Sequence, residues 1–138
     1  MDRADDLLTY RVATDVDCDL LGQMNRQLIV DEGHRNNMTV RELEARMRDW
    51  LAGDYRAVIV DRAKCFAAYA LFREMPAEVY LRQLFVARES RRQGIGRQVL
   101  SILRTHFWPS GKRLTVEVLT ANTDALAFWR AMDTETMQ

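Results

Sequence analysis

The sequence contains few of the residues that mark secreted, fibrous or disordered chains. It has two cysteines, two prolines and six glycines among 138 residues. Cys18 and Cys65 do not have the spacing of a metal site or a disulfide framework. We therefore expect free thiols, a reducing compartment and a Cys65 that is buried in the apolar run it opens. With no repeat and no Pro- or Gly-rich linker, one domain over residues 1–138 is expected.

The chain also lacks an excess of charge of either sign and any long hydrophobic run. Lys+Arg and Asp+Glu both number 20, so the formal net charge is +0. Proteins that bind nucleic acids or membrane surfaces usually carry a basic excess, so neither partner is expected. No window has the length of a membrane span, and the acidic start MDRADDLLTYRV does not have the pattern of a signal peptide. We expect a soluble, cytoplasmic protein.

Hydrophobic periodicity in the first third of the chain predicts a strand followed by two helices. A β-rich run begins at Leu7, and apolar residues recur at helical spacing from Asp19 to about Gly33. Thr39 and Glu42 have the spacing of a capping box, in which each side chain satisfies a backbone amide at the start of a helix.

The remainder of the chain alternates between strands and helices. Three β-rich runs between residues 57 and 86, joined by short turns, predict an antiparallel meander. A helix after Gly94, a strand at residues 114–118 and a final helix in ANTDALAFWRAM follow. This order implies a local parallel pairing through a right-handed crossover. The expected fold class is α+β, with a mixed, mostly antiparallel sheet and helices packed against it.

The stretch ESRRQGIGRQVL, residues 89–100, places arginines and two glycines directly before an amphipathic helix. A helix N-terminus presents amides without partners, and glycine lets the backbone approach an anion closely. Amides from Arg92 to Arg97 could therefore ring a phosphate, and Arg91, Arg92 and Arg97 would add positive potential. The pattern alone is loose, and an ordinary glycine-containing loop with solvated arginines is equally consistent with it.

Two known phosphate-binding loops do not match this stretch. A P-loop requires Gly-x-x-x-x-Gly-Lys-Ser/Thr, and no Lys-Ser or Lys-Thr follows these glycines. The dinucleotide fingerprint requires a third glycine where this chain has Val99, and it follows the first strand of a parallel unit. Several strands precede the loop here. Glu117 lies at about the distance of that fingerprint's ribose-binding acid, which we interpret as coincidence.

The run LFVARESRRQGIGRQVL resembles the central motif of the GNAT acetyltransferases, in which a strand ending in apolar-x-Val precedes Gln/Arg-x-x-Gly-x-Gly/Ala at a helix start. A later motif of that superfamily, Asn-x-x-Ala-x-x-Phe-Tyr, is similar to Asn122, Ala125, Phe128 and Trp129, directly after the strand LTVEV. The resemblance covers roughly residues 8–132. It implies a three-layer α/β/α arrangement around a splayed sheet.

The resemblance implies acetyl-coenzyme A as the acyl donor and no metal. Backbone groups of the strand before the loop would pair with the pantetheine arm, as a strand added to a sheet edge. The loop would hold the pyrophosphate, and Asn122 would reach the pantetheine arm or simply cap its helix. The implied coenzyme-binding residues are Leu84, Phe85, Val86, Arg91, Arg92, Gln93, Gly94, Ile95, Gly96, Arg97 and Asn122.

The implied reaction is the direct transfer of an acetyl group to a primary amine of a small molecule or a protein. A backbone N–H near Phe85 or Val86 would polarise the thioester carbonyl. A tyrosine in the last helix often protonates the leaving thiolate in this family, and its place is taken here by Trp129, whose indole cannot supply a proton. A thiol with a pKa of about 8.5 leaves fairly well unprotonated, so water or another tyrosine could substitute. The catalytic acid and base stay unassigned.

The end of the chain is a second departure from the family pattern. The final helix would ordinarily lead through Gly-Phe into a last strand, where this chain has Asp133 and Thr134. Either that strand is short or absent, or a neighbouring subunit fills its place. A homodimer would cover the exposed sheet edge.

The family places acceptor-binding groups on the first helices and their connection, which is VDEGHRNNMT here. Glu32 and His34 are candidates to bind the acceptor amine or relay its proton, although polar residues at a helix end are the simpler interpretation of each. Tyr80, on the central strand, could face the same cavity. Glu117 could orient a catalytic water or face solvent.

We therefore expect an acetyl-CoA-dependent N-acetyltransferase whose acceptor the sequence does not identify. Two alternatives stay open. Trp129 and the short C-terminus suggest a non-catalytic module that binds or senses acyl-CoA. The glycine loop would also suit a nucleotide-binding regulatory domain.

Overall fold

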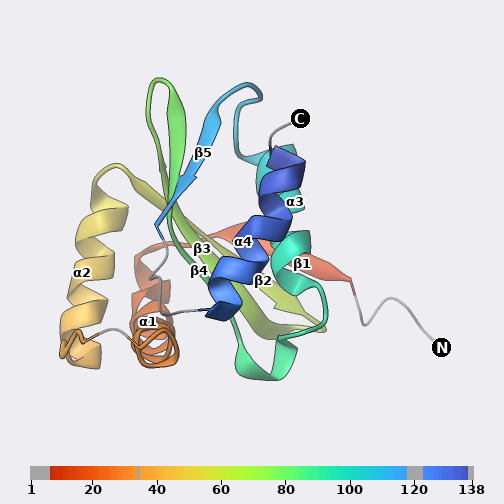
Figure 1. The fold of residues 1–138 in the computed structure, drawn as a ribbon. Helices are drawn as coiled ribbons and strands as arrows, with labels where there is room; N and C mark the ends of the chain where they lie inside the picture. The colour runs from red at the N-terminus through yellow and green to blue at the C-terminus, as the bar shows by residue number, and fades with distance from the viewer. Residues whose placement is uncertain (1–6, 34, 118–122, 137–138) are drawn as a thin grey trace.

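The described part of the chain forms a five-stranded sheet with two α-helices on each face (Figure 1). The computed structural model describes residues 7–33, 35–117 and 123–136, and in the last helix it describes the side chains of residues 124–132 only. The strands are β1 (Leu8–Val12), β2 (Tyr55–Arg62), β3 (Cys65–Glu74), β4 (Glu78–Val86) and β5 (Arg113–Val116), and the helices are α1 (Cys18–Asp31), α2 (Val40–Ala52), α3 (Ile95–His106) and α4 (Thr123–Thr136).

The strands follow the sheet in chain order, from β1 to β5. The first four are antiparallel neighbours, and β5 pairs with β4 in parallel after the crossover through α3. A parallel connection requires such a crossover, whereas the antiparallel strands need only short turns. The predicted α+β class and the mixed, mostly antiparallel sheet are therefore confirmed.

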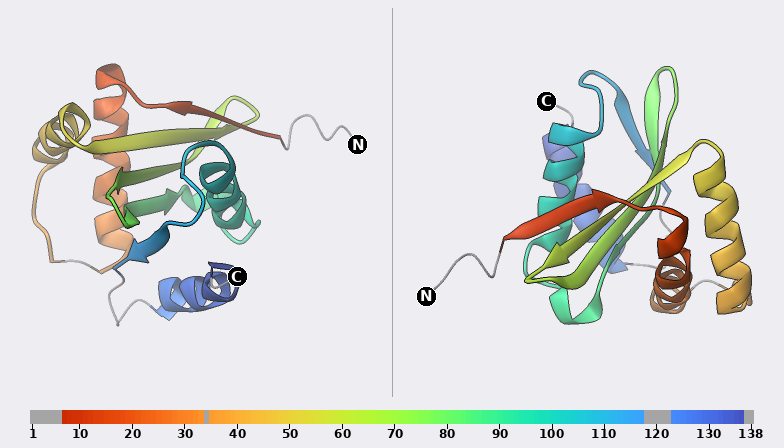
Figure 2. Two further views of the ribbon diagram at one scale, coloured as in Figure 1. Left: turned by 90° about the horizontal axis from the view of Figure 1, so that it is seen from above. Right: turned by 180° about the vertical axis from the view of Figure 1, so that it is seen from behind.

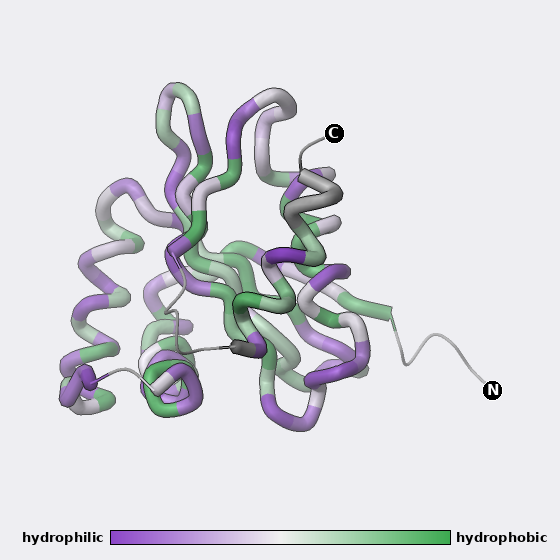
Figure 3. Tube along the Cα trace, in the orientation of Figure 1, coloured by the Kyte–Doolittle hydropathy of each residue, from purple (hydrophilic) through white to green (hydrophobic). Residues whose placement is uncertain are grey.

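Side chains that alternate along β2 separate the two hydrophobic layers. Ala57 and Ile59 pack with residues of α1 and α2, whereas Val58 and Val60 pack with residues of α3 and α4. Both views in Figure 2 show the α1–α2 pair and the α3–α4 pair on opposite sides of the sheet. The most hydrophobic stretches of the trace lie in the central strands (Figure 3). The arrangement is the predicted three-layer α/β/α sandwich.

The predicted capping box begins α2. Glu42 N–H donates to the Thr39 hydroxyl over 3.2 Å, and Thr39 N–H donates to the Glu42 carboxylate over 2.8 Å. Each bond satisfies an amide that the first helical turn leaves without a partner. At the end of the chain α4 continues to Thr136, so Asp133 and Thr134 extend a helix that was expected to end at Met132.

The prediction that Cys65 is buried is wrong, because this residue is exposed whereas Cys18 is fully buried. Cys65 pairs with Arg62 across a two-residue turn at the tip of the β2–β3 hairpin. Both turn residues, Ala63 and Lys64, have positive φ values of 53° and 67°. That geometry matches a tight turn between twisted strands. The strand therefore reaches its buried stretch only at Ala67.

A β-bulge in β4 controls which side chains face each layer. Leu71 of β3 pairs with Gln83, and the next residue, Phe72, pairs with Leu81, so Arg82 is the extra residue. Before the bulge Leu81 packs in the α3–α4 layer, and after it Phe85 packs in the α1–α2 layer. A bulge of this kind re-aims side chains and often lies beside a functional site.

None of the helices in the described part of the chain has both the length and the hydropathy that crossing a membrane requires.

Candidate functional site

The loop before α3 has a backbone conformation suited to an anion. Arg92 and Gly94 have φ values of +63° and +75°, and Gly94 directly precedes the helix. Left-handed residues in a loop turn successive amides toward one point. The first bond of α3 is donated by Gln98 N–H to the Gly94 carbonyl over 3.1 Å. The amides of Ile95 and Gly96 therefore precede the helical ladder and have no acceptor within the helix.

The two glycines of this loop have different roles. A Cβ built on Gly94 meets no atom within 4 Å, so Gly94 borders open space and needs glycine for its positive φ. A Cβ on Gly96 would lie 3.1 Å from the Phe128 ring of α4. Gly96 thus lets α4 pack closely against the first turn of α3, which positions α4 over the loop.

A cavity of about 490 Å³ lies between this loop, the end of β4 and α4. We call it the loop cavity. Nine of the eleven predicted coenzyme-binding residues line it, namely Leu84, Phe85, Val86, Arg91, Arg92, Gly94, Ile95, Gly96 and Arg97. The Gln93 side chain is not among the lining groups, because it donates to the Glu89 carbonyl and accepts a bond from Arg62. Asn122 lies outside the described residues.

The Arg91 guanidinium joins three elements beneath the loop. It donates to the Val86 carbonyl of β4 over 2.7 Å and to the Asp31 carboxylate at the end of α1 over 2.7 Å. Asp31 also accepts bonds from Arg88, and its pKa is lowered mainly by the Arg88 hydrogen bond and then by Arg91. Arg91 therefore braces the loop against the sheet, in addition to adding positive charge to the cavity wall.

The end of β4 presents backbone groups to the loop cavity. The described pairing of β4 with β5 ends at Leu81, whereas β4 continues to Val86. Ala87 N–H donates toward β3, to the Ala67 carbonyl. Backbone groups of successive strand residues point in alternate directions, so those of Val86 and Leu84 face away from β3. Such outward groups can pair with an extended ligand.

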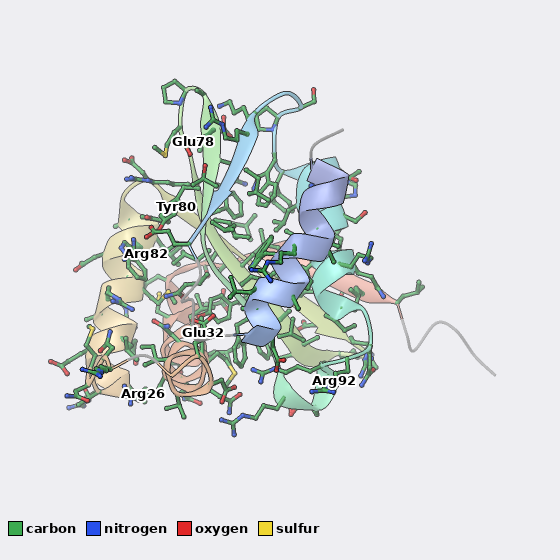
Figure 4. All side chains as sticks on the ribbon, in the orientation of Figure 1. Arg26, Glu32, Glu78, Tyr80, Arg82 and Arg92 are labelled. Carbon is green, nitrogen blue, oxygen red and sulfur yellow. The ribbon has the colours of Figure 1, made fainter. Side chains whose placement is uncertain are left out.

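A second cavity, of about 300 Å³, lies beside the first between α1, α2, β4 and α4. We call it the polar pocket. It contains one carboxylate that directly follows α1, Glu32, and one that follows β5, Glu117, together with Tyr80 of β4. Figure 4 shows Tyr80 and Arg82 in succession along β4, and Arg92 on the loop before α3. The two cavities share Leu28, Glu32, Leu84, Ala125 and Trp129. The shared wall makes them adjoining compartments of one site.

Tyr80 and Glu117 form a hydrogen-bonded pair in the polar pocket. The Tyr80 hydroxyl donates to the Glu117 carboxylate over 2.6 Å. Burial, followed by the Glu117 hydrogen bond and negative charge, raises the pKa of Tyr80 to about 12. The phenol therefore keeps its proton at neutral pH, and its hydrogen bond holds the Glu117 carboxylate in place.

Trp129 lies where the two cavities meet, and its ring packs edge-on against Phe128 with the centroids 4.9 Å apart. This is the position at which the sequence motif led us to look for a tyrosine. The tyrosine hydroxyl in this part of the site comes instead from β4, through Tyr80.

Of the predicted acceptor-site residues, Glu32 and Tyr80 line the polar pocket, and His34 lies outside the described residues. Sequence reasoning missed Asn25, Arg46 and Arg82, which line the same pocket. A signal existed for the first two, because each interrupts the apolar face of an amphipathic helix. No pattern in the sequence marked Arg82, because the direction of its side chain depends on the bulge in β4.

Among the described residues, no group of three or more His, Cys, Asp or Glu side chains is placed to hold a metal ion.

Comparison with solved structures places the same fold in several acetyltransferases. An acetyltransferase from Thermus thermophilus matches with a TM-score of 0.77 at 19% identity, covering 94% of this chain and 87% of that chain. A predicted acetyltransferase with acetyl-CoA from Clostridium acetobutylicum matches at 0.68 and 18% identity, covering 89% and 88%. An aminoglycoside acetyltransferase from an uncultured soil metagenomic sample, in complex with sisomicin, matches at 0.70 and 15% identity, covering 90% and 86%.

No curated protein matches the sequence significantly. The model of the acetyltransferase (GNAT) family, however, matches residues 25–133, which include the second half of α1, all of α2, the glycine loop and most of α4. The matched segment therefore contains the whole of the two-compartment site. This chain belongs to the GNAT family of acetyltransferases.

Proposed function

We propose that this protein transfers an acetyl group from acetyl-CoA to the primary amine of a small molecule. The observation that carries the proposal is the junction of the two cavities. One cavity joins the glycine loop to outward backbone of β4, and the other contains two carboxylates and a tyrosine. Acetyl-CoA held in the loop cavity would present its thioester to an amine held in the polar pocket.

The loop cavity has the groups that acetyl-CoA requires. The amides of Ile95 and Gly96 and the positive charge of Arg92 would bind the pyrophosphate. The outward backbone groups of Leu84 would pair with the pantetheine amides, and so would the N–H of Val86, whose carbonyl accepts the bond from Arg91. The same outward N–H groups could stabilise negative charge on the thioester oxygen during transfer. Acetyl-CoA itself supplies the activated acetyl group.

The polar pocket has the groups that an attacking amine requires. Glu117 would accept the proton that the amine loses as its nitrogen forms the C–N bond and the C–S bond breaks, directly or through one water. Tyr80 would hold that carboxylate in place through its hydroxyl. With a pKa of about 12, Tyr80 is a weaker acid than a thiol, so we assign it to positioning rather than to protonation of the leaving sulfur.

A thiol-release assay tests the proposal. The purified protein is mixed with acetyl-CoA and a panel of primary amines, and free coenzyme A is followed over time. The panel includes peptides and aminoglycosides such as sisomicin, because a structural relative is in complex with that compound. We expect acceptor-dependent release, with an acetylated product that mass spectrometry detects. Binding of acetyl-CoA without release for any amine would instead favour a sensing module, the role that Trp129 suggests.

A further inference from the structure

Two arginines of the polar pocket point to a property of the acceptor beyond its amine. Arg46 of α2 and Arg82 of β4 both line the pocket, and their guanidinium carbons lie 4.4 Å and 4.6 Å from the centroid of the Trp50 ring. Stacking on an aromatic face holds a guanidinium in a fixed orientation. Trp50 thus brings two like charges to one wall of the pocket.

Neither guanidinium is neutralised within the described part of the chain. Arg46 donates to the side-chain oxygen Oδ1 of Asn25 over 3.1 Å, and Arg82 is 3.4 Å from the Tyr55 hydroxyl. No carboxylate of the described residues forms an ion pair with either. Burial, followed by the positive charge of Arg82, lowers the pKa of Arg46. Two adjacent positive charges without a counter-ion favour an anion between or beside them.

Buried donors on the same wall lack acceptors. Asn25 is fully buried, and its Nδ2 has no partner among the described residues. The bond from Arg46 fixes the Asn25 oxygen as the acceptor, so its NH₂ group is the free end. The buried Nε of Arg46 also has no partner there. Buried N–H groups without an acceptor carry a desolvation cost, and a hydrogen bond to a ligand oxygen would remove that cost.

The lining of the same pocket also includes two carboxylates. Glu32 at the end of α1 and Glu117, which is hydrogen-bonded to Tyr80, line it together with the arginines. Figure 4 labels Glu32, Tyr80 and Arg82 of this set. A carboxylate group attracts an ammonium or amine, and a guanidinium binds the two oxygens of a carboxylate. The pocket therefore contains groups suited to an amine as well as groups suited to an acid.

We propose that the acceptor is a primary amine that also carries a carboxylate, which binds to Arg46, Arg82 and the Asn25 amide. This inference rests on the proposed acetyl transfer and adds the chemical class of its acceptor. The acceptor amine lies toward Glu117 and Glu32, and its carboxylate lies against the Trp50-supported arginines. A volume of about 300 Å³ suits a small molecule of this type.

The test compares ω-amino acids of four to six carbons with the n-alkylamines of equal length, which have nearly the same amine basicity. We expect kcat/KM to be about 10-fold or more higher for the amino acids, as charge-assisted hydrogen bonds imply. Arg46→Gln and, separately, Arg82→Gln should reduce this ratio to below about 3-fold through a higher KM for the amino acids. Arg41→Gln, on the same helix but outside the pocket lining, should keep the full ratio.

Calorimetry with 4-aminobutyrate and with butylamine, each in the presence of coenzyme A, gives a readout that does not depend on turnover. Binding of 4-aminobutyrate alone, lost in the Arg46 and Arg82 variants, supports the carboxylate site. Such binding without acetylation would contradict the proposed acetyl transfer and leave the carboxylate site in place. Equal kcat/KM values for the two classes, equal binding of both compounds, or arginine variants that keep the discrimination would overturn the inference.

Discussion

Replacing Gly94 with Asp is expected to weaken acetyl-CoA binding by about 30-fold, because the new carboxylate would face the pyrophosphate. The Cβ at this position points into open space within the loop cavity, so no packing is disturbed. Repulsion between partly solvated charges a few ångströms apart costs about 2 kcal/mol, which corresponds to this factor. Isothermal titration of the purified variant with acetyl-CoA measures the change.

Gly94→Asn is the matched control for this variant. Asn has nearly the same size as Asp and tolerates a positive φ about as well, so both variants carry the same backbone cost. We expect Asn to weaken binding by no more than about 5-fold, since its amide adds no charge. Equal affinities of the Asp and Asn variants for acetyl-CoA would contradict the assignment of the pyrophosphate to this loop.

Replacing Glu117 with Gln is expected to lower kcat by about 100-fold or more, within the range for loss of a general base. The amide keeps the size of the carboxylate and an oxygen that can accept the Tyr80 bond, but it cannot take up the amine proton. Acetyl-CoA affinity should stay unchanged, because Glu117 lines the polar pocket and is not among the residues that line the loop cavity. A steady-state thiol-release assay measures kcat, and calorimetry measures the affinity for acetyl-CoA, so together they separate the two effects.

Tyr80→Phe is the companion variant, and its predicted effect is smaller. A positioning tyrosine with a pKa of about 12 is protonated throughout the neutral and mildly alkaline range. The pH–rate profile of the wild type should therefore show no ionisation of Tyr80 below about pH 11, and Tyr80→Phe should lower kcat without moving the alkaline limb of the profile. A Glu117→Gln variant with wild-type kcat would contradict the assignment of the base.

The sequence determined more of the loop cavity than of the polar pocket, for a physical reason. Residues 84–97 form a continuous strand, loop and helix, and local chemistry dictates their geometry. Glycine permits the positive φ at position 94, and helix periodicity directs Val99 into the core. Contiguous residues whose backbone does the binding can be recognised without knowing the tertiary structure.

The polar pocket is assembled from segments far apart in the chain, and that assembly was not predictable. Arg82 depends on a one-residue bulge against β3, and Tyr80 meets Glu117 only because β5 pairs in parallel with β4. The prediction that Cys65 is buried failed for a related reason. The hydropathy of the sequence does not show that the strand of Cys65 begins at an exposed turn. Register and bulges arise from tertiary packing, which one-dimensional periodicity does not contain.

The shift in Tm on adding acetyl-CoA tests the central claim most directly, with ATP at the same concentration as the comparison ligand. A ligand present at 100 times its Kd that binds only the native state stabilises it by about 2.7 kcal/mol. For a domain of this size that corresponds to a rise in Tm of about 8 °C. We predict this rise for acetyl-CoA and little change for ATP. A rise with ATP and none with acetyl-CoA would contradict the assignment of the loop cavity to coenzyme A.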